Sequence, residues 1–315
     1  MKVGKSSLKY KIDGVRWEVK SKINQIYSGG KMSDIVYLDS HFVPREQAKI
    51  SVFDRGFLFA DAVYEVTAVI DSQLIDFSGH FQRLQRSCKE LGLSIPITKD
   101  QLIHIHHQLI EKNNLHEGLI YLQITRGTDS SRFFDFPPSS VSSTIVAFVQ
   151  HSTVVNHPNA KEGISVISVE DIRWQRCDIK TVALLAACLA KHQAHQQGAD
   201  DAILIKEGYI TEGSSSNFFI VNHNNEIITR PLSQDILPGI TRQAIIQLAQ
   251  EEGLKIIERR FTLDEAKKAK EAFISSATTL IWPVISIDNQ DINQGVVGQL
   301  SQRLREIYLD KALKK

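Results

Sequence analysis

The chain has 315 residues, of which 42% are hydrophobic and 23% charged, and its formal net charge is +1. This length predicts two domains, and the near-neutral charge argues against a polyanionic partner such as nucleic acid. No apolar run reaches the roughly 18 residues that a membrane-spanning helix needs, and three cysteines without CxxC spacing favour a cytoplasmic protein over a disulfide framework or a zinc site.

The charge is unevenly distributed along the chain. Residues 1–31 carry a net charge of +6, and the remainder carries −5. Met32 stands just before the first strand-like run, so we interpret 1–31 as a basic extension without a fold of its own, upstream of the catalytic part. Such tails are usually solvated, although an arm that binds nucleic acid or a membrane is the alternative.

The first half of the catalytic part predicts a small α/β domain over 32–150. Thr98 and Gln101 form a capping box, which predicts the start of a helix, and Gly92 predicts the end of the helix before it. The expected strands are 35–38, 49–53, 63–70, 73–77, 119–125 and 144–149, and the expected helices are 79–91, capped by Ser78, and 99–113.

The second half predicts a larger domain over 161–315, after a linker at 151–160 that contains Asn156 and Pro158. The expected strands are 164–169, 202–205, 209–211, 217–221, 226–229, 255–259 and 272–275, and the expected helices are 181–197, 241–252 and 297–312. This alternation predicts an α/β or α+β architecture.

Several common site signatures are absent from the sequence. It has no GxGxxG, P-loop, HExxH or GxSxG motif. His104, His106 and His107 lie on one expected helix without further ligands nearby, which indicates a helix face and no metal site.

Lys180 is the first candidate for catalysis, because it stands two residues before the apolar run 182–187. Burial disfavours a charged ammonium, and a neutral amine can form an imine with an aldehyde cofactor. A lysine that extends to solvent is the alternative for this residue taken alone.

Glu212 follows the expected strand 209–211 and opens a Gly-Ser-rich turn. A carboxylate there could pair with a pyridinium nitrogen and keep the ring protonated, which makes the ring an electron sink. An ordinary turn between strands is the alternative interpretation.

Three further features could bind phosphate. Gly239 to Arg242 opens an expected helix, whose free N–H groups and dipole attract anions. The run 275–279 offers hydroxyls after a strand, and Arg83 could face the same anion. Each feature is weak alone, since helix caps and surface arginines commonly look like this.

Together these residues carry a resemblance. The pattern Glu212-x-Ser214-x-x-Asn217-Phe218-Phe219, Ile227-x-Thr229 and Leu237-x-Gly239-Ile240-x-Arg242 resembles the signature of class-IV aminotransferases, which are pyridoxal-phosphate enzymes of fold type IV. The resemblance runs from Tyr37 to Tyr308. Within the family, the D-alanine aminotransferases are the most similar, through 54–57, 63–66, 125–128, 170–174 and 176–180.

The resemblance implies a two-domain fold of the D-amino acid aminotransferase type, a homodimer and the cofactor pyridoxal 5′-phosphate. It implies that Lys180 is the catalytic lysine and that Tyr64 and Arg132 bind the substrate carboxylate. The implied cofactor-binding residues are Arg83, Lys180, Glu212, Ile240, Thr241, Ser276, Ala277 and Thr278. The implied reaction transfers the amino group of a small D-amino acid, with D-alanine the best candidate, to 2-oxoglutarate, which gives pyruvate and D-glutamate.

One departure concerns the substrate. The D-alanine enzymes have Arg-x-His in their carboxylate trap, whereas this chain has Arg132-Phe133-Phe134. A phenyl ring cannot donate a hydrogen bond to a carboxylate, although Arg132 can still pair with one. The alternatives are therefore an aminodeoxychorismate lyase, a branched-chain L-amino acid aminotransferase, or a catalytically silent protein that binds pyridoxal phosphate or nucleic acid.

Overall fold

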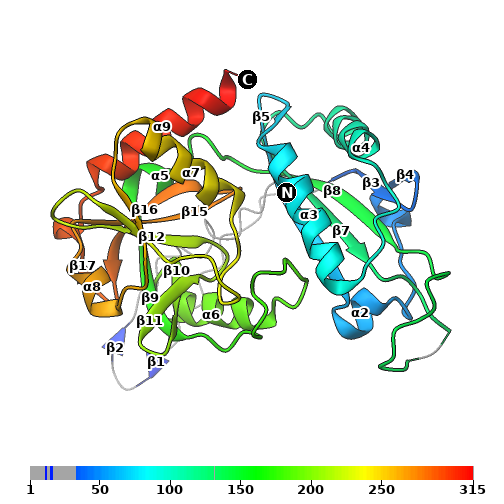
Figure 1. Ribbon diagram of the computed structural model, residues 1–315, viewed down its shortest axis with the longest axis horizontal. Coiled ribbons are helices and arrows are strands. Elements are labelled where there is room, and N and C mark those ends of the chain that lie inside the picture. Colours follow the sequence, from blue (N-terminus) through cyan, green and yellow to red (C-terminus); the bar gives the residue numbers. More distant parts are fainter. Residues whose placement is uncertain (1–10, 13–14, 17–32, 131, 315) are drawn as a thin grey trace.

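The computed structural model describes residues 11–12, 15–16, 33–130 and 132–314. Within them the chain forms two lobes that lie side by side (Figure 1). Most of the basic extension 1–31 lies outside the described residues, apart from β1 (Lys11–Ile12) and β2 (Val15–Arg16), which pair antiparallel.

The smaller lobe contains an antiparallel sheet in the order β4-β3-β8-β7-β5-β6. Its strands are β3 (Ile35–Leu38), β4 (His41–Pro44), β5 (Ala62–Ile70), β6 (Gln73–Leu74), β7 (Gly118–Thr125) and β8 (Ile145–His151). Its helices are η1 (Arg45–Gln47), α2 (Arg55–Phe59), α3 (Phe77–Leu91) and α4 (Lys99–Lys112). The apolar faces of α3 and α4 share one buried core with the sheet.

The larger lobe contains a mixed sheet in the order β11-β10-β9-β16-β15-β12-β13-β14, with β17 paired to β16. Its strands are β9 (Ile164–Glu170), β10 (Asp201–Lys206), β11 (Tyr209–Gly213), β12 (Asn217–Val221), β13 (Ile227–Thr229), β14 (Ile256–Glu258), β15 (Glu271–Ser276), β16 (Leu280–Ile287) and β17 (Gln290–Asp291). Its helices are α5 (Pro158–Glu162), α6 (Leu185–Gln196), α7 (Ile240–Glu251), α8 (Leu263–Lys267), η2 (Asn293–Gly295) and α9 (Gln299–Leu313). The expected mixed α/β class is confirmed.

Local sequence signals explain several boundaries. The Thr98 side chain accepts from the Gln101 N–H and the Gln101 side chain accepts from the Thr98 N–H, which confirms the capping box of α4. Gly92 ends α3 in the left-handed region at φ 60°, as expected. Ser78 does not cap α3, however, because the helix already begins at Phe77, after Asp76 at φ 51°.

Three expected elements were wrong or shorter. Residues 49–53 are not a strand, because the Asp54 N–H bonds to the Ser51 carbonyl in a turn. Phe53 is half exposed, so the apolar composition of this run did not indicate a buried strand. The strand expected at 73–77 is limited to Gln73–Leu74, because α3 begins at Phe77. The helix expected from 181 begins only at Leu185, which leaves Lys180 on a loop.

Strand β16 was not expected, because Pro283 lies inside it and proline argues against a strand interior. The linker predicted at 151–160 stays a proposal; within it, residues 152–157 connect β8 to α5, and α5 begins at Pro158. Among the described residues, no helix is long and apolar enough to cross a membrane, and no cluster of side chains could hold a metal ion.

Candidate active site

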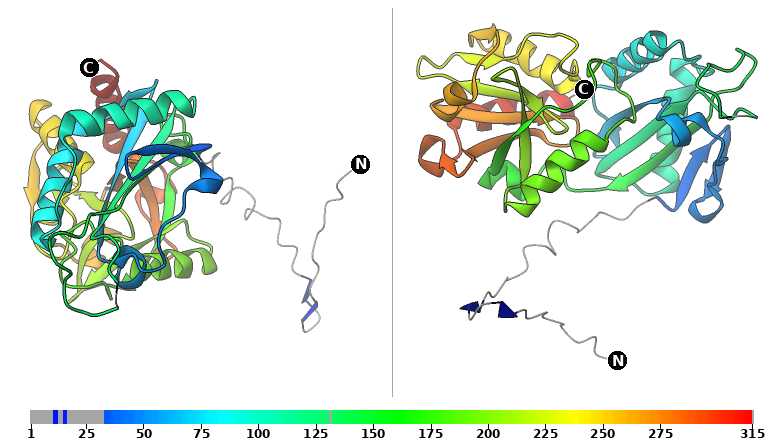
Figure 2. Two further views of the ribbon diagram at one scale, coloured as in Figure 1. Left: turned by 90° about the vertical axis from the view of Figure 1, so that its right-hand side faces the viewer. Right: turned by 90° about the horizontal axis from the view of Figure 1, so that it is seen from below.

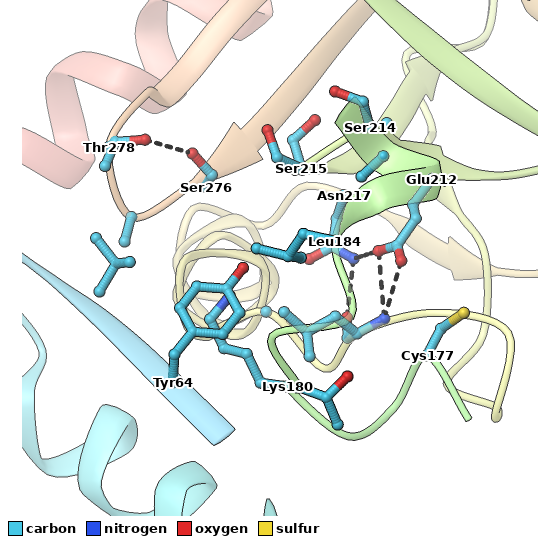
Figure 3. A pocket seen from close by; sticks show the side chains of 18 of the residues that line it. Tyr64, Cys177, Lys180, Leu184, Glu212, Ser214, Ser215, Asn217, Ser276 and Thr278 are labelled. Atoms are coloured by element: carbon cyan, nitrogen blue, oxygen red, sulfur yellow. Dashed lines mark hydrogen bonds between the residues drawn. The ribbon is translucent and has the colours of Figure 1, made fainter. Parts of the chain in front are cut away.

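A cavity of about 320 Å³ lies between the lobes, a size typical of small-molecule sites. Figure 3 shows Glu212 towards one side and Ser276 with Thr278 towards the other, with Lys180 and Tyr64 below them. The predicted site residues that line the cavity are Tyr64, Arg83, Lys180, Glu212, Ile240, Thr241, Ser276, Ala277 and Thr278. The cavity is thus lined by both lobes. The larger lobe contributes the ends of β11 and β15, the start of α7 and the loop before α6, and the smaller lobe contributes β5 and α3.

Lys180 is fixed by the smaller lobe, although it belongs to the chain that leads into α6. Its N–H donates to Ser87 Oγ at 3.3 Å, and its carbonyl accepts from the Tyr64 N–H at 3.0 Å. Its Nζ lies 4.1 Å from the centre of the Tyr64 ring. The amine is therefore half-buried, held against an aromatic face, and directed into the cavity (Figure 3).

Glu212 is buried at the end of β11. Arg173 Nη1 donates to its Oε1 at 2.5 Å, Asn217 Nδ2 donates to its Oε2 at 3.0 Å, and the Leu237 N–H lies 3.2 Å from both oxygens. Burial raises the pKa of Glu212, and the Arg173 guanidinium opposes that rise. Three donors contact a carboxylate that has about four lone-pair positions, so Glu212 has the capacity to accept one further N–H from the cavity that it lines.

Arg173 is a residue whose role sequence reasoning missed. It donates to both oxygens of Asp171 at 2.9 and 2.7 Å and to Glu212. Burial lowers the pKa of Arg173, but Asp171 and Glu212 more than offset this and leave it raised. The resemblance of 170–174 to the family was a signal that this stretch matters. A single sequence does not show, however, that Arg173 donates a hydrogen bond to Glu212.

The other end of the cavity offers donors to an anion. Helix α7 begins after Gly239 without a side-chain cap, which leaves its first N–H groups available. A Cβ at Gly239 would lie 2.0 Å from Asn217 Oδ1, so only glycine allows this close approach. In the turn after β15, Ser276 Oγ lies 3.2 Å from Thr278 Oγ1 and 2.9 Å from Thr279 Oγ1.

Two buried hydroxyls at the cavity have no hydrogen-bond partner among the described residues. They are Ser216 Oγ and Ser275 Oγ, on residues 7% and 1% exposed. A buried hydroxyl without a partner costs free energy of about 1–3 kcal/mol. The start of α7 with the hydroxyls of Ser276 and Thr278 fits the oxygens of a phosphorylated cofactor, and Glu212 fits a protonated ring nitrogen.

Arg83 is buried beside the start of α7. Its Nε and Nη2 donate to the two oxygens of Glu65, both at 2.8 Å, and its Nη1 donates to the Pro238 carbonyl at 3.1 Å. Burial alone would raise the pKa of Glu65, but Arg83 and then His80 outweigh it and lower the pKa to about 2. Sequence reasoning missed Glu65 and His80, although a glutamate within an apolar strand was a usable signal.

Arg132 is not among the residues that line the cavity. It lies on the exposed loop after β7, with its Cζ 5.2 Å from the Phe59 ring centre and 5.9 Å from that of Phe134. Phe134, which replaces the expected histidine, is 81% exposed. Within one chain, therefore, the two predicted carboxylate-binding residues Tyr64 and Arg132 are not brought together.

The chain is similar to known proteins over most of its length. The profile of the family described as amino-transferase class IV matches residues 62–287. A D-alanine aminotransferase of Staphylococcus aureus is 37% identical over 271 residues, which cover 86% of this chain and 95% of the relative.

Solved structures show the same fold. The branched-chain amino acid aminotransferase of Escherichia coli has a TM-score of 0.81 and 26% identity, over 89% of this chain and 95% of that chain. The branched-chain aminotransferase of the archaeon Thermoproteus uzoniensis, solved with norvaline, has a TM-score of 0.77 and 26% identity, over 90% of this chain and 96% of that chain.

Proposed function

The chain belongs to class IV of the aminotransferases, which use pyridoxal 5′-phosphate, and we propose that it transfers the amino group of a small D-amino acid to 2-oxoglutarate. D-alanine is the proposed donor, so the products are pyruvate and D-glutamate. The observation that carries this proposal is one cavity that holds the Lys180 amine, the Glu212 carboxylate and a cradle of hydroxyls and N–H groups. The 37% identity to a D-alanine aminotransferase supports the choice of donor.

We assign the residues to the cofactor as follows. Glu212 holds the proton of the ring nitrogen, and Arg83 with the start of α7 and the turn 276–278 binds the phosphate. When bound, the cofactor supplies an aldehyde that accepts the amino group and a ring that withdraws electrons. Lys180 would hold the cofactor between reactions and, as a free amine, would move the proton from the substrate Cα to the cofactor carbon that receives the amino group.

Substrate binding requires a second subunit in this proposal. Tyr64 lies beside Lys180 in the cavity, whereas Arg132 lies on a loop that does not reach it. The surface around that loop exposes large apolar side chains, with Phe57 and Phe133 each 68% exposed. Clustered exposed apolar residues are typical of protein interfaces, which supports a homodimer in which Arg132 serves the site of the partner copy.

The three cysteines are free, which is compatible with the cytoplasmic location that we propose.

A branched-chain L-amino acid aminotransferase is the second candidate, because the solved structures described above are branched-chain enzymes and because Phe134 removes a polar group from the expected trap.

The test is a panel of D- and L-amino acids with 2-oxoglutarate, in which each 2-oxo acid product is measured. We expect pyruvate from D-alanine, and a loss on the order of 10³-fold in Lys180→Ala, with the exposed Lys161→Ala as the matched control. Turnover of L-leucine alone would establish the second candidate. Pyruvate from aminodeoxychorismate without 2-oxoglutarate would instead identify a lyase, and absence of all turnover with bound cofactor would identify a silent binder.

A further inference from the structure

The C-terminal helix α9 ends at the junction of the two lobes, as both Figure 1 and Figure 2 show. Its Tyr308 belongs to a small buried core that draws on both lobes and on the segment between them. That core includes Ala68 and Ile70 of β5, Val154 of the connection, Leu248 of α7 and Leu280 of β16. Helix α9 is therefore packed where the lobes meet, next to the elements that form the phosphate end of the cavity.

Arg305 lies one turn before Tyr308 on the same face of α9, and both are buried. Its Nη1 donates to the carbonyls of Thr279 and Ile281 at 2.7 and 2.9 Å, and its Nη2 donates to those of Val154 and Val155 at 2.6 and 2.9 Å. The guanidinium thus joins the turn after Ser276 to the connection between the lobes. None of the ion pairs between described residues includes Arg305.

Tyr308 makes the second link. Its hydroxyl donates to Asp76 Oδ2 at 2.7 Å, and Asp76 directly precedes α3 of the smaller lobe. Thr241, which lies in the first turn of α7 and lines the cavity, is close enough to this hydroxyl to influence it. The Tyr308 hydroxyl therefore bonds to the start of α3 and lies beside the start of α7.

The two helix starts are also in direct contact. A Cβ at Gly79 of α3 would lie 3.0 Å from Ile240 Cγ2, so the glycine allows the helices to approach closely. The start of α7 and the turn after β15 are the two halves of the proposed phosphate cradle. Tyr308 packs with α7 in one core and bonds to Asp76 of the smaller lobe, and Arg305 joins the second half to the connection between the lobes.

We propose that Arg305 and Tyr308 are positioning residues that join the two lobes around the phosphate cradle and thereby set the affinity for the phosphate of the cofactor. This inference rests on the proposed assignment of the cradle. Neither residue is among those that line the cavity, so they act through Thr241 and the 276–279 turn.

The decisive measurement compares pyridoxal phosphate with pyridoxal, which lacks the phosphate, by titration of the full-length apoprotein followed by absorbance. Tyr308→Phe keeps the ring in its buried core and removes only the hydroxyl. We expect its dissociation constant for pyridoxal phosphate to rise roughly tenfold, the scale of one hydrogen bond, while that for pyridoxal stays unchanged. Tyr209→Phe, distant in the larger lobe, is the matched control and should change neither constant.

Arg305→Lys is the second variant, because it keeps the charge but cannot reach four carbonyls at once. It should show the same phosphate-specific loss, whereas Arg303→Lys on the exposed face of the same helix should not. Thermal melting of the apoproteins identifies any general loss of stability, and Tyr308→Phe decides alone if Arg305→Lys does not fold. Equal changes for both ligands, or no change, would overturn the proposal.

The wild-type protein separates this inference from the proposed function. If wild-type apoprotein binds pyridoxal as tightly as pyridoxal phosphate, the cradle itself is wrongly assigned. If it prefers the phosphorylated form and Tyr308→Phe retains that preference in full, only the role of α9 is wrong.

Discussion

The two arginines that we assign to anions lie in opposite surroundings. Arg83 is buried, and Glu65 and the Pro238 carbonyl fix its guanidinium beside the cavity. Arg132 is exposed on a loop, where its described contacts are with the rings of Phe59 and Phe134. A charge-paired, buried side chain is already oriented before its ligand arrives, whereas an exposed one must be ordered by a further surface.

This difference separates the two binding tasks of the proposed enzyme. The cofactor end of the cavity is assembled from one chain, with Lys180 and Glu212 held by hydrogen bonds from several elements. The substrate end has Tyr64 but lacks Arg132. Damage to the first region should therefore affect cofactor chemistry or folding, and damage to the second should affect only substrate binding.

The largest effect is expected for Glu212→Gln, because a neutral amide cannot stabilise a protonated ring nitrogen. We expect kcat with D-alanine and 2-oxoglutarate to fall about 10²–10³-fold, with the dissociation constant for the cofactor changed far less. Glu207→Gln, on an exposed turn, is the control. Retention of kcat in Glu212→Gln would show that this carboxylate does not serve the ring.

The next effect concerns acid stability. Because the pKa of Glu65 is lowered from 4.5 to about 2, its ionised form stabilises the fold above pH 4.5, and this contribution is lost as the pH falls towards 2. The wild type should lose on the order of 3 kcal/mol of unfolding free energy from this group over that window.

Glu65→Gln should be less stable than the wild type at pH 7, and the gap should close near pH 2, as measured by urea unfolding at several pH values. The exposed Glu46→Gln should follow the wild type. A constant gap at all pH values would mean that Glu65 is not the titrating group.

Arg132→Ala tests the exposed region. Loss of a charge-assisted pair to the substrate carboxylate should lower kcat/KM about 10–100-fold and leave the affinity for pyridoxal phosphate unchanged. Mixing Arg132→Ala with Lys180→Ala subunits should give kcat/KM above that of either variant alone, because a mixed dimer has one intact site. Failure to restore activity in proven mixed dimers would place Arg132 outside the partner's site.

The smallest effect is expected for Phe134→His, which adds one hydrogen-bond donor near Arg132. A gain of about 1 kcal/mol would lower KM for D-alanine several-fold without changing kcat. Phe133→His, at the adjacent and also exposed position, is the matched control. An equal response of the two variants would remove any specific role of position 134 in substrate choice.

The sequence predicted which residues line the cavity where those residues stand at fixed spacings within one motif. Lys180, Glu212 and the start of α7 were selected by short-range patterns together with the family resemblance, and all of them line the cavity, whereas the capping box at Thr98 follows from its local pattern alone. Glu65 and Arg83 are 18 residues apart, on a strand and a helix, and their pairing depends on how α3 packs on the sheet. A single sequence does not contain that information, and the same holds for Arg173 and Glu212, which are 39 residues apart.

The stretch Leu237-Pro238-Gly239 has a consequence for the spacing of the proposed anchors. The Leu237 N–H contacts Glu212, the Pro238 carbonyl accepts from Arg83, and Gly239 precedes α7. Consecutive Cα atoms are about 3.8 Å apart. These three residues therefore set the distance between Glu212, which we assign to the ring nitrogen, and the start of α7, which we assign to the phosphate. We expect that an insertion of one residue here would change this distance, so that a ligand of fixed length could no longer reach both groups. An insertion in the Asn-rich turn at 222–225 would leave the distance unchanged.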